Sequence, residues 1–238
     1  MTYNVDEHQS DNHYNCPLVA YYPEVIAANT DFGDTKFVYP YLSFEDEKSF
    51  NKAMRLHFSK VGIDFSLKAL HKAFIAGNQA YEKMMNKLHQ QHEVAMSYAE
   101  INDCDIVLLC GRPYHLDPLI NHQIDQLLNQ LGFVVLSEES VPHLDRQKVN
   151  VLNQWTYHAR LYQAAKYCSQ YPNMELVQLV SFGCGIDSIT SDEVRDILAS
   201  NNKFYTQIKI DEIDNLGAAR IRLRSLKEAS KEKRDELR

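Results

Sequence analysis

The sequence predicts an α/β protein with a parallel sheet of the flavodoxin or Rossmann kind, covered by helices on both faces. Two observations support this. Apolar runs typical of buried strands alternate with helical patterns between residues 101 and 214. Glycines and prolines punctuate these runs, as they do at the ends of strands and helices. Strands that alternate with helices form right-handed crossovers and a parallel sheet.

Four strands and three connecting helices make up the predicted flavodoxin-like subdomain, 101–214. Each strand is a short apolar or β-branched run, and each helix has apolar residues at spacings of three and four. The expected strands are 105–110, 133–136, 176–181 and 205–210, and the expected helices are 117–131, 148–170 and 189–200.

The remainder of the chain is predicted to form three parts. Residues 1–60 are expected to hold a polar tail, a helical segment and the remnant of a second α/β subdomain. A long helix connects the two subdomains over 61–100, and 215–238 form a charged helix. Within the first part, short strands are expected at 18–22 and 36–39, each ended by a proline.

Bulk composition limits the functions open to the chain. It has 238 residues, 45% hydrophobic and 24% charged, as in ordinary globular proteins. A net charge of −7 gives no electrostatic case for nucleic-acid binding. No apolar run approaches the roughly 18 residues of a membrane span, and the N-terminus is too polar for a signal peptide. We therefore expect a cytoplasmic protein that binds neither nucleic acid nor membrane.

Cysteine usage argues against a disulfide framework. The number of cysteines is odd, and no Cys-x-x-Cys pair occurs, so zinc ribbons and ferredoxin-type runs are absent. Any metal cluster would have to collect cysteines that lie far apart in the chain. The five cysteines are Cys16, Cys104, Cys110, Cys168 and Cys184.

Cys184 is the most informative candidate. It follows the predicted strand 176–181, stands between Gly183 and Gly185, and precedes a predicted helix. This order places a thiol at the carboxyl edge of the sheet, where open α/β folds bind their ligands. The glycines permit unusual backbone angles and close approach of a ligand, and a helix start favours the thiolate. The alternative is a small apolar residue in an ordinary turn.

A second loop opens on the same edge. Arg112, Tyr114 and His115 follow the strand 105–110 directly after Gly111, and they add a guanidinium, a phenol and an imidazole to the thiol. His115 could equally be a hydrogen-bonding residue under the loop. A cysteine hydrolase is the weakest interpretation, because the glycines of a nucleophile elbow lie two residues, not one, from the nucleophile.

Four segments follow one pattern along the chain. The first is Asn15–Ile26, which begins Asn-Cys-Pro-Leu-Val-Ala-Tyr-Tyr-Pro, and the others are Gly111–His122, Ser181–Asp187 and Lys209–Arg220. Together they resemble one bacterial iron–sulfur family, the CoA-substrate-specific enzyme activase proteins related to the D-component of 2-hydroxyacyl-CoA dehydratases.

The resemblance implies flavodoxin-like subdomains that hold a [4Fe–4S] cluster or a double cubane. Cys16 and Cys184 would be its ligands, with Gly183 and Gly185 beside it. Arg112, Tyr114 and His115 would line the adjoining pocket as substrate contacts or proton donors. The implied partners are an ATP-hydrolysing activator, or upstream domains, and an acyl-CoA substrate.

The chain departs from that family in one respect. Relatives carry a further cysteine motif and ATP-hydrolysing domains upstream of the segment that holds Cys16, so we expect a C-terminal fragment or a split subunit. Two ligands are too few for a cubane unless another chain, water or substrate completes it. The isolated chain could therefore lack the cluster, and a cluster-free structural or interaction subunit is the alternative function.

Overall fold

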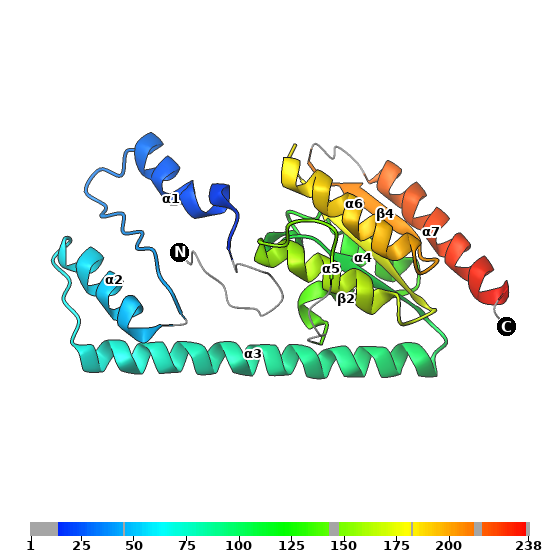
Figure 1. The fold of residues 1–238 in the computed structure, drawn as a ribbon, viewed down its shortest axis with the longest axis horizontal. Helices are drawn as coiled ribbons and strands as arrows, with labels where there is room; N and C mark the ends of the chain where they lie inside the picture. The colour runs from blue at the N-terminus through cyan, green and yellow to red at the C-terminus, as the bar shows by residue number, and fades with distance from the viewer. Residues whose placement is uncertain (1–13, 45, 143–147, 182, 212–215, 237–238) are drawn as a thin grey trace. The chain divides into compact units, whose positions relative to one another are not determined.

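The computed structural model describes residues 14–44, 46–142, 148–181, 183–211 and 216–236. The chain divides into two compact units, drawn as ribbons in Figure 1. The first unit comprises residues 1–86 and 154–156, and the second comprises 87–153 and 157–238. The predicted boundaries at 60, 100 and 214 stay predictions.

A four-stranded parallel sheet forms the centre of the second unit. Its strand order is β2-β1-β3-β4, the order of flavodoxin-like sheets. In the register of the two central strands, Leu108 of β1 lies opposite Leu176 of β3. This sheet confirms the predicted α/β fold class. The strands are β1 (Asp105–Cys110), β2 (Phe133–Ser137), β3 (Met174–Val180) and β4 (Tyr205–Lys209).

Helices cover both faces of this sheet, because side chains along each strand alternate between the two sides. Val107 and Leu109 of β1 pack on one face with α4 (Ile124–Gln130) and α7 (Gly217–Glu236). Ile106 and Leu108 pack on the other face. The helices there are α5 (Thr156–Cys168), α6 (Gly185–Ala199) and the end of α3 (Leu67–Ile101).

The helix predicted at 117–131 begins later than expected. A short 3₁₀ helix, η1 (Pro113–Leu116), is followed by turns, and α4 starts only at Ile124. The reason is local hydrogen bonding, in which the Asp117 carboxylate accepts from the amide of Leu119 at 2.8 Å and Asn121 accepts from that of Gln123. Short polar side chains that take backbone amides in this way compete with helix formation.

Two other helix starts also differ from the prediction. The helix expected at 148–170 begins at Thr156, as α5. The helix expected at 189–200 begins four residues earlier, at Gly185, as α6. The second difference matters for function, because it makes Cys184 the N-cap residue of α6.

Neither of the two strands predicted in the first unit is present among its described residues. Residues 18–22 belong to α1 (Pro17–Asn29), and 36–39 form no strand. Pro17 accounts for part of the error, because proline suits the first turn of a helix as well as a strand edge. The helical segment predicted within 1–60 is present as α2 (Glu47–Ser59), and the long helix predicted over 61–100 is present as α3. The predicted tail, up to residue 13, lies outside the described chain.

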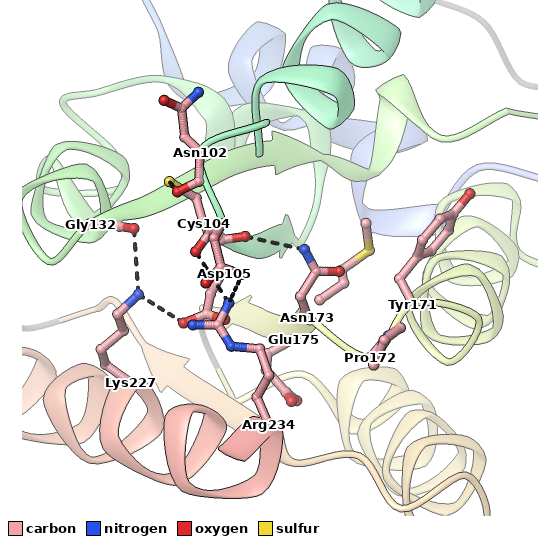
Figure 2. Close-up of polar contacts among 12 residues, drawn as sticks. Asn102, Cys104, Asp105, Gly132, Tyr171, Pro172, Asn173, Glu175, Lys227 and Arg234 are labelled. Carbon is pink, nitrogen blue, oxygen red and sulfur yellow. Dashed lines mark hydrogen bonds and ion pairs between the residues drawn. The ribbon is translucent and has the colours of Figure 1, made fainter. Parts of the chain in front are cut away.

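An ionic network fixes α7 to the amino edge of the sheet. Asp105, at the start of β1, has a carboxylate only 2% exposed, and it pairs with Lys227 at 2.8 Å and Arg234 at 3.0 Å. Figure 2 shows both cations reaching this carboxylate from α7. Glu175 at the start of β3 is equally buried, with Lys203 at 3.9 Å. Since a buried carboxylate is costly without a counter-charge, the edge depends on these cations.

None of the helices in the parts of the chain described by the structure combines the length and the apolar character that crossing a bilayer requires.

The double variant Lys227→Met/Arg234→Met tests the ionic network. It would leave the buried carboxylate of Asp105 unpaired, and we expect it to lower the free energy of unfolding by about 3–5 kcal/mol in urea titrations. Lys209→Met is the control, because its pair with Asp211 is 59% exposed on the lysine side and should cost less than about 1 kcal/mol. Equal losses in the two proteins would contradict this account.

Candidate functional site

The candidate site lies at the carboxyl ends of β1 and β3, which are neighbours in the sheet. From β1 the chain continues to β2 on one side, and from β3 it continues to β4 on the other. The two loops therefore separate at this point, and ligands of open α/β folds bind in the resulting crevice. The loop after β1 carries Arg112, Tyr114 and His115, and the loop after β3 carries Ser181 and Cys184.

An ion pair joins the two loops. The Nη2 of Arg112 donates to the Oδ1 of Asp187, in the first turn of α6, at 2.7 Å. The two side chains are only 11% and 12% exposed. Burial alone would lower the pKa of Arg112, but Asp187, Tyr114 and Cys184 outweigh it and raise the pKa. The guanidinium is therefore held in its charged form.

His115 is buried and neutral. Its Nδ1 accepts from the backbone N–H of Arg112 at 3.0 Å, so the ring proton is on Nε2, which donates to Ser181 Oγ at 3.0 Å. Burial, and next the charge of Arg112, lower the pKa of His115 to about 4. The Tyr114 hydroxyl lies 3.3 Å from Ser181 Oγ and also accepts from Arg112 Nη1. The structure thus brings Arg112, Tyr114 and His115 together, as a cross-linked set.

Gly111 makes this arrangement possible. A Cβ at this position would collide with the imidazole of His115, whose ring lies against the glycine backbone. The glycine is therefore needed for a close approach within the loop.

We expect Gly111→Ala to displace the His115 ring and to cost about 1–3 kcal/mol of unfolding free energy, as overpacking does in well-filled cores. Urea unfolding and the NMR signal of the His115 ring would measure the two effects. Gly183→Ala is the matched control, since a Cβ there would meet no atom within 4 Å. A variant Gly111→Ala as stable as Gly183→Ala, with an unshifted ring, would contradict the steric explanation.

Cys184 and Cys16 have the same local setting, each in its own unit. Cys184 is the N-cap of α6 and Cys16 is the N-cap of α1. Both are half-buried, and within the described chain neither thiol makes the capping hydrogen bond. A helix N-terminus carries partial positive charge. Each sulfur is therefore free for another partner, in an environment that suits ligation.

The other cysteines fit structural roles. Cys110 and Cys168 are buried, and burial raises the pKa of both thiols, that of Cys168 to about 12. Cys104 is half-buried at the entry to β1. Within the described ranges, no group of three or more His, Cys, Asp or Glu residues is arranged to hold a metal ion.

Gly183 and Gly185 flank Cys184 without unusual backbone angles, because neither has a positive φ. A side chain at either position would meet no atom within 4 Å. Their surroundings are open, which leaves space beside the thiol.

Sequence reasoning missed His158, a buried histidine in the first turn of α5, 3.7 Å from Asp187. Nothing around it in the sequence marks it, because only the fold brings α5 and α6 together. Asp187 had a signal, since it lies within the segment Ser181–Asp187 of the family resemblance.

Glu138 lies buried beyond the end of β2, close to the Arg112 loop. Burial raises the pKa of this carboxyl to about 8, although Arg160 and a hydrogen bond from Gly111 lower it. The folded protein therefore keeps a proton on Glu138 that the unfolded chain releases above its ordinary value near 4.5. It follows that stability decreases as the pH rises from about 4.5 to about 8.

We expect Glu138→Gln to remove this loss. The variant should gain stability relative to the native protein as the pH rises from 5 to 8, by on the order of a few kcal/mol at pH 8, because each unit of pKa shift is worth about 1.4 kcal/mol. Urea unfolding at several pH values measures it. Glu139→Gln, one residue along, is the control, and a parallel pH dependence of Glu138→Gln and the native protein would refute the assignment.

The fold and the site define a flavodoxin-like α/β protein with a half-buried cysteine and a buried ion pair at the crevice of its sheet. Residues 1–141 match the model of the CoA enzyme activase uncharacterised domain (DUF2229), and the chain belongs to this family. The matched range includes Cys16 and the Arg112 loop but ends before Cys184. Neither the curated proteins nor the solved structures contain a match.

Proposed function

We propose that this CoA enzyme activase family member is a redox module of the dehydratase D-component type, which helps to hold a [4Fe–4S]-type cluster and accepts electrons from an ATP-dependent activator. The observation that carries the proposal is the shared setting of Cys16 and Cys184, two thiols that start helices and make no capping hydrogen bond within the described chain. Thiolates are the usual ligands of such clusters.

The surroundings of Cys184 support an anionic group. The first backbone N–H groups of a helix have no partner within the helix, and they stabilise negative charge. A cluster held by thiolates carries net negative charge, so the type of donor and the helix N-terminus both fit it.

The number of donors is smaller than a cubane needs. The family resemblance implies two cysteine ligands in this chain, and four ligands are usual. The proposal therefore requires further ligands from another polypeptide, from solvent or from substrate. When bound, the cluster would supply one-electron chemistry, and Cys16 and Cys184 would hold it.

Arg112, Tyr114 and His115 would line the pocket beside this group. His115 is neutral at physiological pH and fixed as a donor to Ser181, so its role is to orient the loop hydroxyls. Tyr114 is half-exposed and offers its hydroxyl to a polar substrate group. The substrate class we propose for this pocket is an acyl-CoA thioester.

Anaerobic reconstitution with ferrous iron, sulfide and an excess of a small thiol, which supplies the missing ligands, tests the proposal. We expect a broad charge-transfer absorption in the visible range, together with bound iron and sulfide. Cys16→Ser and Cys184→Ser should each lose most of the bound iron. Cys104→Ser is the matched control, another half-buried cysteine, and should behave as the native protein. Equal iron contents in the native protein and in Cys16→Ser/Cys184→Ser would defeat the proposal.

A cluster-free interaction subunit is the second candidate, and α1 favours it. This helix is apolar on all sides, yet only Ala20 is buried, while Leu18 is 70% and Tyr21 58% exposed. A helix that is apolar all round is normally covered. A native protein that takes up no iron, but is isolated with a partner that Tyr21→Lys releases, would favour this candidate.

A further inference from the structure

The second unit contains a cavity of about 660 Å³ beside the amino edge of its sheet, whereas the candidate site lies at the carboxyl edge. This volume is within the range of small-molecule sites. The cavity is lined by the last turns of α3 and by the loop between α5 and β3. Figure 2 shows part of this lining, Tyr171, Pro172 and Asn173, together with Arg234. None of these residues belongs to the candidate site.

The buried part of the lining is apolar and aromatic. Ala99 and Ile106 are almost fully buried. Tyr167 and Tyr171 lie with their ring centroids 5.0 Å apart, and a hydrogen bond of 2.7 Å between the Tyr167 hydroxyl and Nε2 of His92 holds the first ring in place. Methylene groups pack favourably on apolar side chains, and the faces of aromatic rings attract cations.

The exposed part of the lining is acidic. Glu93 and Glu100 are exposed, and Asp103 lines the same cavity. Among its described lining residues, Arg234 is the only basic one. Its Nη1 already lies 3.4 Å from Asp103 and 3.0 Å from the buried Asp105. The lining therefore carries net negative charge, which favours a cationic ligand over an anionic one.

The position of Glu100 is a second reason to expect a cation. It lies in the last turn of α3, where the aligned peptide dipoles give the helix end partial negative charge and make an acidic side chain unfavourable. Basic side chains are usual in such a turn, and this one has none. A cation bound in the cavity would interact favourably with the carboxylate and with the helix end.

The spacing of the two exposed carboxylates limits the shape of the ligand. Glu93 and Glu100 are seven residues apart on α3, which places them on one face of the helix at a separation of about 10 Å. Met96 and Ala99 lie between them and also line the cavity. Two acidic positions joined by an apolar surface are complementary to two positive charges joined by a hydrocarbon chain.

We propose that this cavity binds a linear aliphatic diamine or polyamine. Two of its ammonium groups, about 10 Å apart, pair with Glu93 and Glu100. Its methylene chain lies over Ala99 and Ile106, and the ring of Tyr171 attracts one of the ammonium groups. The inference does not depend on the proposed function, since the cavity contains none of the residues of the candidate site.

Isothermal titration calorimetry on the full chain tests the proposal with three amines. The extended chain of 1,8-diaminooctane matches the separation of the carboxylates, that of 1,4-diaminobutane is about half as long, and octylamine has the longer chain with only one charge. We expect 1,8-diaminooctane to bind about tenfold more tightly than either of the others, because only it can form both ion pairs across the apolar surface.

Two charge variants locate the binding. Glu93→Gln/Glu100→Gln should weaken the binding of 1,8-diaminooctane about tenfold. Glu228→Gln/Asp235→Asn is the matched control, since it removes the same charge from two exposed residues at the same spacing on α7, and it should bind as the native protein does. Tyr171→Leu should weaken binding about threefold through loss of the ring, whereas Tyr171→Phe should retain it.

Two results would overturn the inference. Equal affinities for the three amines, or equal losses in the two charge variants, would show that amines are attracted only by the net charge of −7. Binding of tetralysine without binding of 1,8-diaminooctane would show that the surface recognises a basic peptide instead. A preference for the longer diamine that Glu93→Gln/Glu100→Gln alone abolishes would uphold it.

Discussion

The ion pair between Arg112 and Asp187 is the interaction on which the candidate site depends. It joins the loop after β1 to the first turn of α6, at a point where the chain leaves the two strands in opposite directions. Both side chains are nearly buried, so removing one would leave the charge of the other buried and unpaired. Arg112 also donates from its guanidinium to the Tyr114 hydroxyl and from its backbone N–H to His115. The His115 ring in turn bonds to Ser181.

This arrangement is a property of topology as much as of sequence. A flavodoxin-like strand order brings the first and third strands of the sheet side by side, although about 70 residues separate their loops. Two family-like segments therefore meet in space and form one polar cluster. The family match covers only the first of them, so the cluster spans the matched region and the region beyond it.

Much of this could be predicted from sequence, and the failures have physical causes. The strands of the sheet were predictable because a strand buried on both faces is continuously apolar, as in Ile106–Cys110. The shared edge of the Arg112 and Cys184 loops followed from the alternation of strands and helices. Residues 18–22 were mistaken for a strand because an apolar run after a proline satisfies both patterns. His158 could not be found, since its place beside Asp187 depends on packing between α5 and α6.

The first unit contains a small piece of distant chain. The backbone of Tyr14 forms hydrogen bonds with the backbone of Gln154 and Thr156, and Tyr14 forms an isolated β-bridge with Trp155. The segment that leads to Cys16 is therefore held in the first unit by residues that come 140 positions later in the chain. During synthesis, the ribosome releases the N-terminal helices long before this closing piece exists. The cysteine near the beginning of the chain is therefore anchored late, after the strands β1 and β2 have already emerged.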